Sequence, residues 1–379
     1  MGAYQQMGHQ SHNLLSDKSL STYEGAILSP VNYCEEDVTN IIGRFGSDHF
    51  EMIFDPQLYF PNTARGNLPN WTYFPRDVDT ADQTSLTWWN QTINIISDTV
   101  QRIRAHSVCS PSVVPRTYSP EYFLLNRELG RMLQSNIHAS QIETLQTILV
   151  RLDWLSNPNI SPEIASIMSA SDISRAYLVI ITDVEPRREL RETEEIKGAM
   201  RLIHFLENSG IQVLVGFASS DLVLWKAAGA SDCATGKFFN LRRFTPGRWE
   251  PPPQGGGQMS YWFEEAIMAY VRTSDLSRLQ AVGLISDNSL NNPFGQPILD
   301  QIATNPKEAW IALGWRQYMY WFANFESRIQ NQSTFNLDLL LKSAEENWQI
   351  LDTKKILMDE PQNDGGWLRP WRRSIIEAF

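Results

Sequence analysis

The stretch Tyr177-Leu-Val-Ile-Ile-Thr-Asp183 decides the fold, because its first five residues form an unbroken apolar run. A run of this kind is typical of a strand that is buried on both faces of a parallel sheet. Residues 192–208 follow it and place Ile196, Met200 and Ile203 on one helical face, with a stop signal at Asn-Ser-Gly 208–210. A strand followed by an amphipathic helix is the repeating unit of α/β proteins.

The same unit repeats along the first two thirds of the chain. The eight predicted strands are Ala3–Gly8, Gly25–Ser29, Phe50–Asp55, His106–Ser110, Thr147–Asp153, Ala176–Asp183, Gln212–Phe217 and Ala234–Asn240. Eight such units over about 245 residues match a (β/α)8 TIM-type barrel. An open doubly wound sheet is the alternative. Its dinucleotide fingerprint is absent from the sequence, as are a Walker A loop and a G-x-S-x-G elbow.

The composition changes near residue 250. We predict an α/β barrel carrying the active site over residues 1–250, and a C-terminal helical region over residues 251–379 that begins with the linker Pro251-Pro-Pro-Gln-Gly-Gly-Gly257. Within that region, Tyr261–Val271 is predicted to be the last barrel helix. Pro306–Gln330 and Asn336–Lys355 are predicted to be long helices. The aromatic and basic tail Trp367–Arg373 is predicted to pack as a helix on the barrel.

Composition limits the function classes. The 379 residues carry a net charge of −11 and only three Cys, so neither a disulfide framework nor a four-Cys zinc site is expected. A protein that coats nucleic acid non-specifically needs many Lys and Arg to neutralise phosphates, and the negative net charge argues against that function. A local rim of basic residues is still compatible with this composition. Without a long apolar run or a signal segment, we expect a cytoplasmic protein that binds no membrane and needs no cofactor.

Three apolar strands end in an aspartate: Asp55, Asp153 and Asp183. Because the C-terminal ends of barrel strands converge on one mouth, these carboxylates are expected to open on the same end. A buried carboxylate costs several kcal/mol unless it is paired, so a functional cluster explains them better than packing does. Such a cluster suits divalent-metal binding, glycosidic cleavage or deprotonation beside a carbonyl. His9 and His12 offer a metal-ligand spacing, but loop histidines more commonly form hydrogen bonds, and we predict no metal.

Substrate binding is predicted at the strand ends and on the long loop from Pro56 to Ser85. Interleaved aromatic and arginine side chains there suit base stacking and phosphate binding, while an ordered loop held by its own aromatics is the alternative. The predicted binding residues are His9, Gln10, His12, Gln57, Tyr59, Arg65, Trp71, Arg187, Arg188, Lys237, Arg242 and Arg243.

Two segments resemble the tRNA-guanine transglycosylase family. The stretch from Val213 to Cys233 is similar to the family's strand, glycine turn, capped helix and aspartate-bearing run, and the resemblance implies a catalytic role for Asp232. Ile53-Phe-Asp55-Pro-Gln-Leu-Tyr-Phe60 resembles the family's strand end whose Asp acts beside the nucleophile. The family's C-terminal cysteine-rich zinc module is missing, so the resemblance implies a DNA-acting or base-excising relative, with DNA favoured over tRNA.

These observations lead to a functional hypothesis. The protein is predicted to cleave an N-glycosidic bond in nucleic acid, as a DNA glycosylase or base transglycosylase acting on a flipped and modified base, in anti-phage defence among other settings. The catalytic candidates are Asp55, Asp232, Asp153 and Asp183. One enzymatic alternative is a carbohydrate glycoside hydrolase. A non-enzymatic alternative is a barrel that serves as a binding subunit, with a homo-oligomer or a partner contacting the C-terminal helices.

Overall fold

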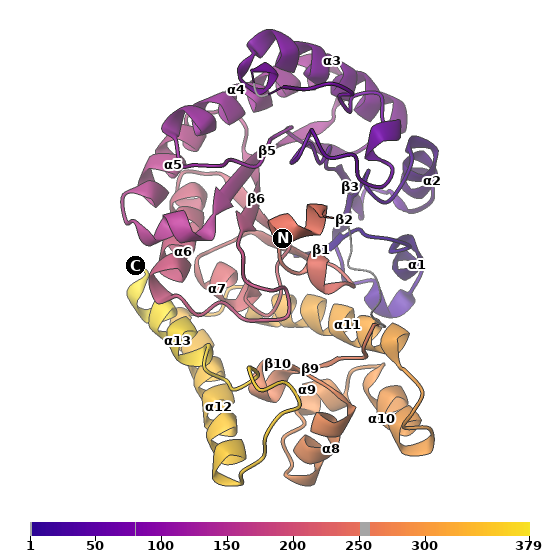
Figure 1. Ribbon diagram of the computed structural model, residues 1–379, viewed down its shortest axis with the longest axis vertical. Helices are drawn as coiled ribbons and strands as arrows, with labels where there is room; N and C mark the ends of the chain where they lie inside the picture. The colour runs from indigo at the N-terminus through magenta and orange to yellow at the C-terminus, as the bar shows by residue number, and fades with distance from the viewer. Residues whose placement is uncertain (1, 80, 251–257) are drawn as a thin grey trace.

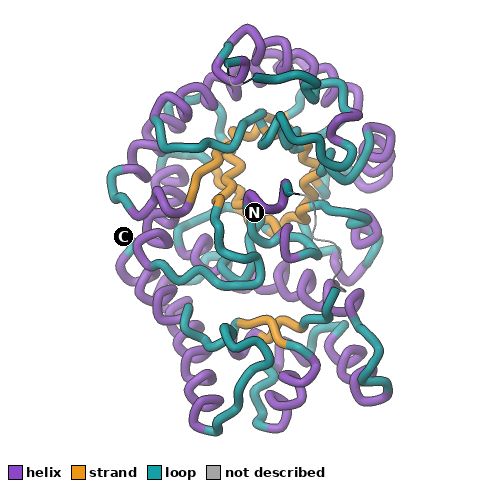
Figure 2. The backbone as a smooth tube through the Cα atoms, in the orientation of Figure 1, coloured by secondary structure: helices purple, strands orange, loops and turns teal. Residues whose placement is uncertain are grey.

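The computed structural model describes residues 2–79, 81–250 and 258–379. Eight parallel strands form a closed barrel in which the first strand pairs with the eighth, so the predicted TIM barrel is confirmed (Figures 1 and 2). The strands are β1 (Ala3–Gln6), β2 (Gly25–Leu28), β3 (Glu51–Phe54), β4 (Ser107–Cys109), β5 (Glu143–Arg151), β6 (Arg175–Ile181), β7 (Gln212–Gly216) and β8 (Asp232–Thr235). An open doubly wound sheet is excluded by this closure.

The eighth strand differs from its predicted bounds. It begins at Asp232, two residues before the predicted start at Ala234, and it ends at Thr235 instead of Asn240. Its register pairs Ala3 with Cys233. Gly236, which follows the strand, packs closely against Leu241 and leaves no room for a side chain.

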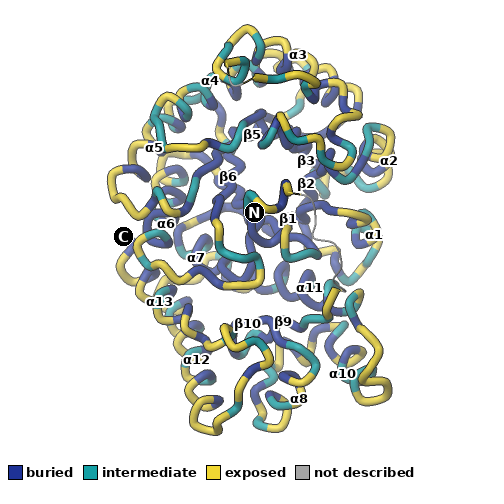
Figure 3. The backbone as a smooth tube through the Cα atoms, in the orientation of Figure 1, coloured by how far each residue is buried: buried dark blue, intermediate teal, exposed yellow. Residues whose placement is uncertain are grey.

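Helices cover the outside of the barrel (Figure 1). They are α1 (His12–Leu15), α2 (Glu35–Phe45), α3 (Leu86–Ile103), α4 (Pro120–Ile137), α5 (Ile160–Ser169), α6 (Thr193–Asn208) and α7 (Leu222–Ala227). The α6 helix buries the face that carries Ile196, Met200 and Ile203, and Gly210 takes the left-handed backbone conformation just after it, at φ +82°. Figure 3 shows the strands buried and the outer surfaces of these helices exposed, as the apolar runs and amphipathic patterns predict.

The eighth helical position is filled by a helix from the C-terminal region. α11 (Ile311–Ile329) packs against β1, β8 and α7. The Tyr23 hydroxyl donates to the Met319 carbonyl at 2.8 Å, and the ammonium of Lys226 lies 2.7 Å from the carboxylate of Glu326, with both side chains buried. One hydrophobic core therefore extends through both predicted segments of the chain.

The segment predicted to be the last barrel helix is instead a β-hairpin. β9 (Trp262–Glu264) and β10 (Ala269–Val271) pair antiparallel, with the one-turn 3-10 helix η8 (Glu265–Ile267) between them. Met268 adopts a left-handed conformation, φ 51°, that turns the chain back. The prediction was wrong because a short, fully buried apolar run has the same composition in a strand as in a helix.

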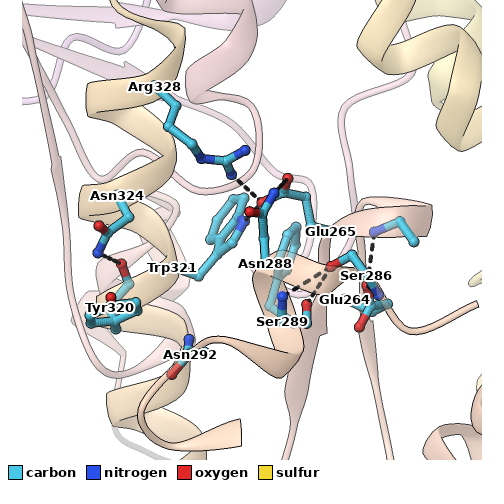
Figure 4. A network of polar contacts seen from close by, with 12 residues as sticks. Glu264, Glu265, Ser286, Asn288, Ser289, Asn292, Tyr320, Trp321, Asn324 and Arg328 are labelled. Atoms are coloured by element: carbon cyan, nitrogen blue, oxygen red, sulfur yellow. Dashed lines mark hydrogen bonds and ion pairs between the residues drawn. The ribbon is translucent and has the colours of Figure 1, made fainter.

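The remaining helices are α8 (Thr273–Ala281), α9 (Asp287–Leu290), α10 (Gly295–Thr304), α12 (Thr334–Thr353) and α13 (Leu368–Glu377). The two long predicted helices are confirmed as α11 and α12, and the tail packs as α13, where Trp371 Nε1 donates to the Leu190 carbonyl at 2.8 Å. In the network of Figure 4, Glu265 accepts hydrogen bonds from Trp321 and Asn288 and pairs with Arg328, which fixes the hairpin on α11. The predicted linker at 251–257 lies outside the described residues. No helix that the structure describes is long and apolar enough to cross a membrane.

Candidate functional site at the barrel mouth

The chain after β8 folds back over the C-terminal end of the barrel (Figure 2). Phe244 accepts a backbone hydrogen bond from Thr182 at 3.1 Å, and its ring packs edge-on against Tyr59 and Phe217. The 3-10 helix η7 (Pro246–Trp249) follows and buries Arg248 and Trp249. Arg248 of this segment also lines a cavity at this end of the barrel.

Asp55 lies in the interior beneath this segment. Its carboxylate is 1% exposed and accepts hydrogen bonds from the Gln57 amide at 3.0 Å and the Tyr59 hydroxyl at 2.7 Å. Burial raises the pKa of Asp55 to about 6, while these two hydrogen bonds and nearby Arg248 oppose the rise. Asp55 therefore exchanges a proton close to neutral pH.

Amide side chains complete this polar interior. Gln57 accepts from Ser29 at 2.9 Å, and Gln6 accepts from the Tyr177 hydroxyl at 3.0 Å. The Nε2 atoms of both glutamines are buried and lack a hydrogen-bond partner among the described residues. Buried amides without partners are uncommon in folded proteins, and they mark this interior as a place where a further polar group fits.

The predicted common end of the three aspartates is confirmed, because Asp55, Asp153 and Asp183 each follow the C-terminal end of a parallel strand. They do not form one cluster. Asp153 and Asp183 both pair with Arg151, at 3.1 Å and 2.9 Å, and their side chains are 53% and 71% exposed on the rim. These two carboxylates therefore share one partner, Arg151, and neither contacts Asp55.

The expected position of Asp232 at the mouth is wrong. Asp232 opens β8 at the opposite end of the barrel, where its carboxylate accepts from the Gly2 amide at 2.6 Å. Burial raises its pKa and the Gly2 hydrogen bond opposes the rise. Asp232 precedes the predicted strand and opens the observed one, so it lies at the N-terminal end in both cases. The resemblance to the transglycosylase family, and not the strand pattern, led to the expectation of a catalytic Asp232.

The aromatic residues of the Pro56–Ser85 loop are mostly structural. Tyr59 and Trp71 are buried, and Trp71 Nε1 donates to the carbonyls of Pro30 and Tyr33 at 3.2 Å and 3.1 Å. These contacts agree with the alternative interpretation, in which the loop is held in place by its own aromatic side chains and these do not bind substrate. Arg65 differs, since it reaches the mouth and donates to the Glu250 carbonyl at 3.0 Å.

The predicted arginine rim is only partly present. Arg188 pairs with Glu185 at 3.2 Å and Arg187 pairs with Glu185 at 2.7 Å. The prediction that Arg243 binds substrate at the rim is corrected. Arg243 is buried, bonds Asp221 at 3.1 Å and Glu189 at 3.5 Å in the segments after β7 and β6, and does not line the cavity described below. Arg242 is buried as well, with its guanidinium 3.4 Å from the Tyr318 ring centroid.

A cavity of about 680 Å³ opens between the β1, β2 and β8 strand ends and α11. Five cationic side chains line it, and no acidic side chain does among the described residues. The segment 251–257, which lies outside the described residues, contains no acidic residue in its sequence either. The lining residues are Gly8, His9, Val31, Asn32, Arg65, Arg187, Lys237, Phe238, Phe239, Asn240, Leu241, Arg242, Arg248, Gln258, Met259, Tyr261, Ile311, Gly314 and Trp315.

Four of these cations form no ion pair within the part of the chain that the structure describes. Arg242 donates to the carbonyls of Gly236 and Lys237, Arg248 to that of Asn240, and Arg65 to that of Glu250. Burial, with the charge of Arg65, lowers the pKa of Arg248 to about 10. Carbonyl oxygens orient these guanidinium groups without neutralising them, and among the described residues only Arg248 has a carboxylate, Asp55, close enough to affect its charge. The cavity lining therefore carries a net positive charge.

The three residues after β1 lie beside this cavity. His9 lines it, and His9, Gln10 and His12 also line a neighbouring cavity of about 330 Å³. Nδ1 of His12 is buried without a hydrogen-bond partner in the described ranges. No group of three His, Cys, Asp or Glu residues in those ranges is arranged to hold a metal ion.

Sequence reasoning missed Phe238, Phe239 and Trp315. It did place Arg242, Arg243 and Arg248, which follow the last strand, in the basic rim, and two of these three, Arg242 and Arg248, line the cavity. Trp315 has no local signal, since α11 reaches the mouth only through tertiary packing.

The fold and the cavity define a TIM barrel with a cationic mouth. No protein-family model matches the chain, and no curated protein does. Among solved structures, a type I 3-dehydroquinate dehydratase from Clostridium difficile is 6% identical, with a TM-score of 0.35 over 65% of this chain and 88% of that one. The BexX/CysO complex of Amycolatopsis orientalis is 14% identical, with a TM-score of 0.37 over 68% and 95%. A GH18 chitinase from Pseudoalteromonas aurantia is 8% identical, with a TM-score of 0.36 over 63% and 95%. These values assign no activity.

Proposed function

We propose that this protein is an enzyme whose barrel mouth binds a phosphate-bearing ligand that also carries a ring. The observation that carries the proposal is the set of four cations without a carboxylate partner around one cavity. Holding a charge away from water without a counter-ion costs several kcal/mol. A bound phosphate offsets that cost, and Arg groups bind phosphate in a bidentate manner.

The aromatic lining supports the second part of the proposal. Phe238 and Trp315 contact each other edge-on at 5.2 Å, and Phe239 and Tyr261 at 5.1 Å. Aromatic faces next to cations suit the bases of nucleotides, which stack on such rings. A nucleotide, free or within a nucleic acid, therefore fits the cavity better than a neutral carbohydrate.

The narrower proposal is N-glycosidic cleavage of a nucleotide in DNA. Its support is Asp55, whose pKa near 6 suits proton transfer at neutral pH and which interacts with the cavity-lining Arg248. Asp153, Asp183 and Asp232 lie elsewhere, so Asp55 alone carries the acid–base role. Access to Asp55 from the cavity requires movement of the 244–249 segment.

Titration calorimetry tests the binding proposal. Pyrophosphate, a nucleoside 5′-monophosphate, a short single-stranded DNA and a neutral oligosaccharide are compared on the parent protein and on Arg65→Ala. Loss of one phosphate contact removes about 1.5–3 kcal/mol, which is at least a tenfold weaker Kd. The matched control is Arg131→Ala, because Arg131 is exposed and pairs with Glu128 three residues away on α4. Equal affinity in both variants, or preference for the oligosaccharide, would contradict the proposal.

Product analysis tests the narrower proposal. DNA carrying different natural base modifications is incubated with the parent and with Asp55→Asn, and free base is measured by mass spectrometry. Turnover should fall by at least ~10²-fold in the variant while pyrophosphate binding persists. Binding of DNA with no base released by either protein would favour a binding subunit.

A further inference from the structure

Lys237 occupies an unusual place in the cavity. It follows β8 directly after Gly236, and its ammonium lies 4.8 Å from the ring centroids of both Phe238 and Trp315. The residue is 6% exposed, and it makes no ion pair and no side-chain hydrogen bond with any described residue. The cavity lining thus holds an amine that nothing in the described chain neutralises or fixes.

A second buried lysine gives the contrast. Lys226 is 5% exposed at its side chain, but its ammonium bonds Glu326 at 2.7 Å and the Ser231 carbonyl at 3.0 Å. That lysine is held as a structural cation. Lys237 has two aromatic rings in place of these oxygen partners, and rings stabilise an ammonium much less than a carboxylate does in a buried site.

The surroundings of Lys237 favour a neutral amine. Burial, with the charge of Arg316, lowers the pKa of Lys237 to about 8. Arg316 itself pairs with Asp17 at 3.0 Å, so its positive charge is partly compensated. At pH 7.5 roughly a quarter of such an amine is unprotonated, against about 0.1% for an ordinary lysine with a pKa near 10.4.

We propose that Lys237 is a nucleophile that condenses with the carbonyl group of a phosphorylated aldehyde or ketone held in the cavity. The neutral amine adds to the carbonyl carbon, and one N–H proton moves to the oxygen to give a carbinolamine. Loss of that hydroxyl as water, with a proton, leaves an imine between Nζ and the substrate carbon. No oxidant or reductant takes part in this condensation.

The other cations of the cavity can bind the phosphate, so Lys237 is not needed for that role. Arg65, Arg242 and Arg248 already supply positive charge for a phosphate, whereas a lysine kept for phosphate binding gains nothing from a lowered pKa. Neutral, desolvated lysines are the form that attacks carbonyl groups. The phosphate in the proposed substrate class rests on the proposed function, but the nucleophilic amine does not.

Reductive trapping tests the proposal on the intact protein. Pyridoxal 5′-phosphate, an aromatic aldehyde with a phosphate, is added at pH 7.5, borohydride then reduces any imine, and labelled lysines are located by peptide mass spectrometry. Lys237 should be labelled at least ~10-fold faster than exposed Lys342, with a pH dependence centred near 8. Lys237→Met removes the amine and should remove this label, and because no described partner is lost the melting temperature should not fall.

Two further arms separate this inference from phosphate binding. Pyridoxal lacks the phosphate, and pyrophosphate competes for the phosphate subsite. If the phosphate form labels Lys237 faster and pyrophosphate protects it, both proposals are supported. Equal labelling by both aldehydes without protection supports the nucleophile and overturns phosphate binding. Pyrophosphate binding with Lys237 labelled no faster than Lys342 overturns the nucleophile alone.

Discussion

Replacing Arg248 with methionine tests whether the positive charge of this side chain destabilises the protein when no anionic ligand is bound at the barrel mouth. The pKa of Arg248 falls from 12.5 to about 10 through burial, which corresponds to about 3 kcal/mol for holding the charge in the folded protein. The charge makes one hydrogen bond, 3.1 Å to the Asn240 carbonyl, and lies 5.0 Å from the Phe217 ring. These contacts return about 1 kcal/mol each. Arg248→Met should therefore raise the free energy of unfolding by about 1 kcal/mol.

Urea unfolding at pH 5 isolates this effect, because Asp55, with a pKa of about 6, is mainly protonated there. Arg248 is charged in both the folded and the unfolded state at that pH. The gain should shrink as pH rises through about 6, because Asp55 then ionises and its charge favours charged Arg248. Pyrophosphate should stabilise the parent protein more than Arg248→Met at the same concentration, since ligand stabilisation grows with affinity for the folded form.

The matched control is Arg243→Met. Arg243 is equally buried, but it bonds Asp221 and Glu189, and removing one member of a buried pair costs about 3–5 kcal/mol. The two variants should therefore shift stability in opposite directions. A loss of stability in Arg248→Met as large as in Arg243→Met would show that the protein itself satisfies Arg248, and the case for a missing anion would fail.

Three other expectations follow from the same contacts. Because burial raises the pKa of Asp55 above its unfolded value, Asp55 should contribute a fall of about 3 kcal/mol in parent stability as pH rises from about 4 to 6, and Asp55→Asn should remove this contribution in urea titrations. Asp232→Ala should cost about 1–3 kcal/mol by leaving the Gly2 amide without its acceptor, with pyrophosphate affinity by calorimetry unchanged; weaker binding would place Asp232 in the site after all. Glu326→Ala should cost about 3–5 kcal/mol by leaving Lys226 unpaired, and calorimetry should show one transition, whereas two would indicate that barrel and C-terminal region unfold separately.

The strand order was predictable and the eighth helix was not. Runs such as 177–181 are apolar because both faces of the strand are covered, and this shows directly in the sequence. The helix that covers β8 begins at Ile311, far along the chain, and only its contacts with β1 and α7 reveal its role. Local patterns therefore assigned that role to the nearest apolar segment, Tyr261–Val271, which forms a hairpin.

The carboxylate prediction was half right for a related reason. Strand ends place Asp55 and Asp183 at one end of the barrel, but the sequence does not show what fills the space between them. Ile181 bridges to Phe244, and that segment closes over Asp55 while Asp183 stays on the exposed rim. The loop that follows β8 thus determines which of the two carboxylates is buried. The sequence around either aspartate carries no signal for this tertiary contact.

The unpaired cations at the mouth do not result from a shortage of acidic residues. The chain has 43 acidic and 32 basic residues, and elsewhere it pairs its buried cations closely, as Arg175 with Glu51 at 2.8 Å and Lys226 with Glu326 at 2.7 Å. The fold thus provides acidic partners for these cations. Three cations around a single cavity have no such ion-pair partner in the described chain: Arg65, Lys237 and Arg248. We therefore expect a ligand from outside the chain to bind this positive charge. The guanidinium groups suit the phosphate of such a ligand, and the amine of Lys237, closest to neutrality, suits its chemistry.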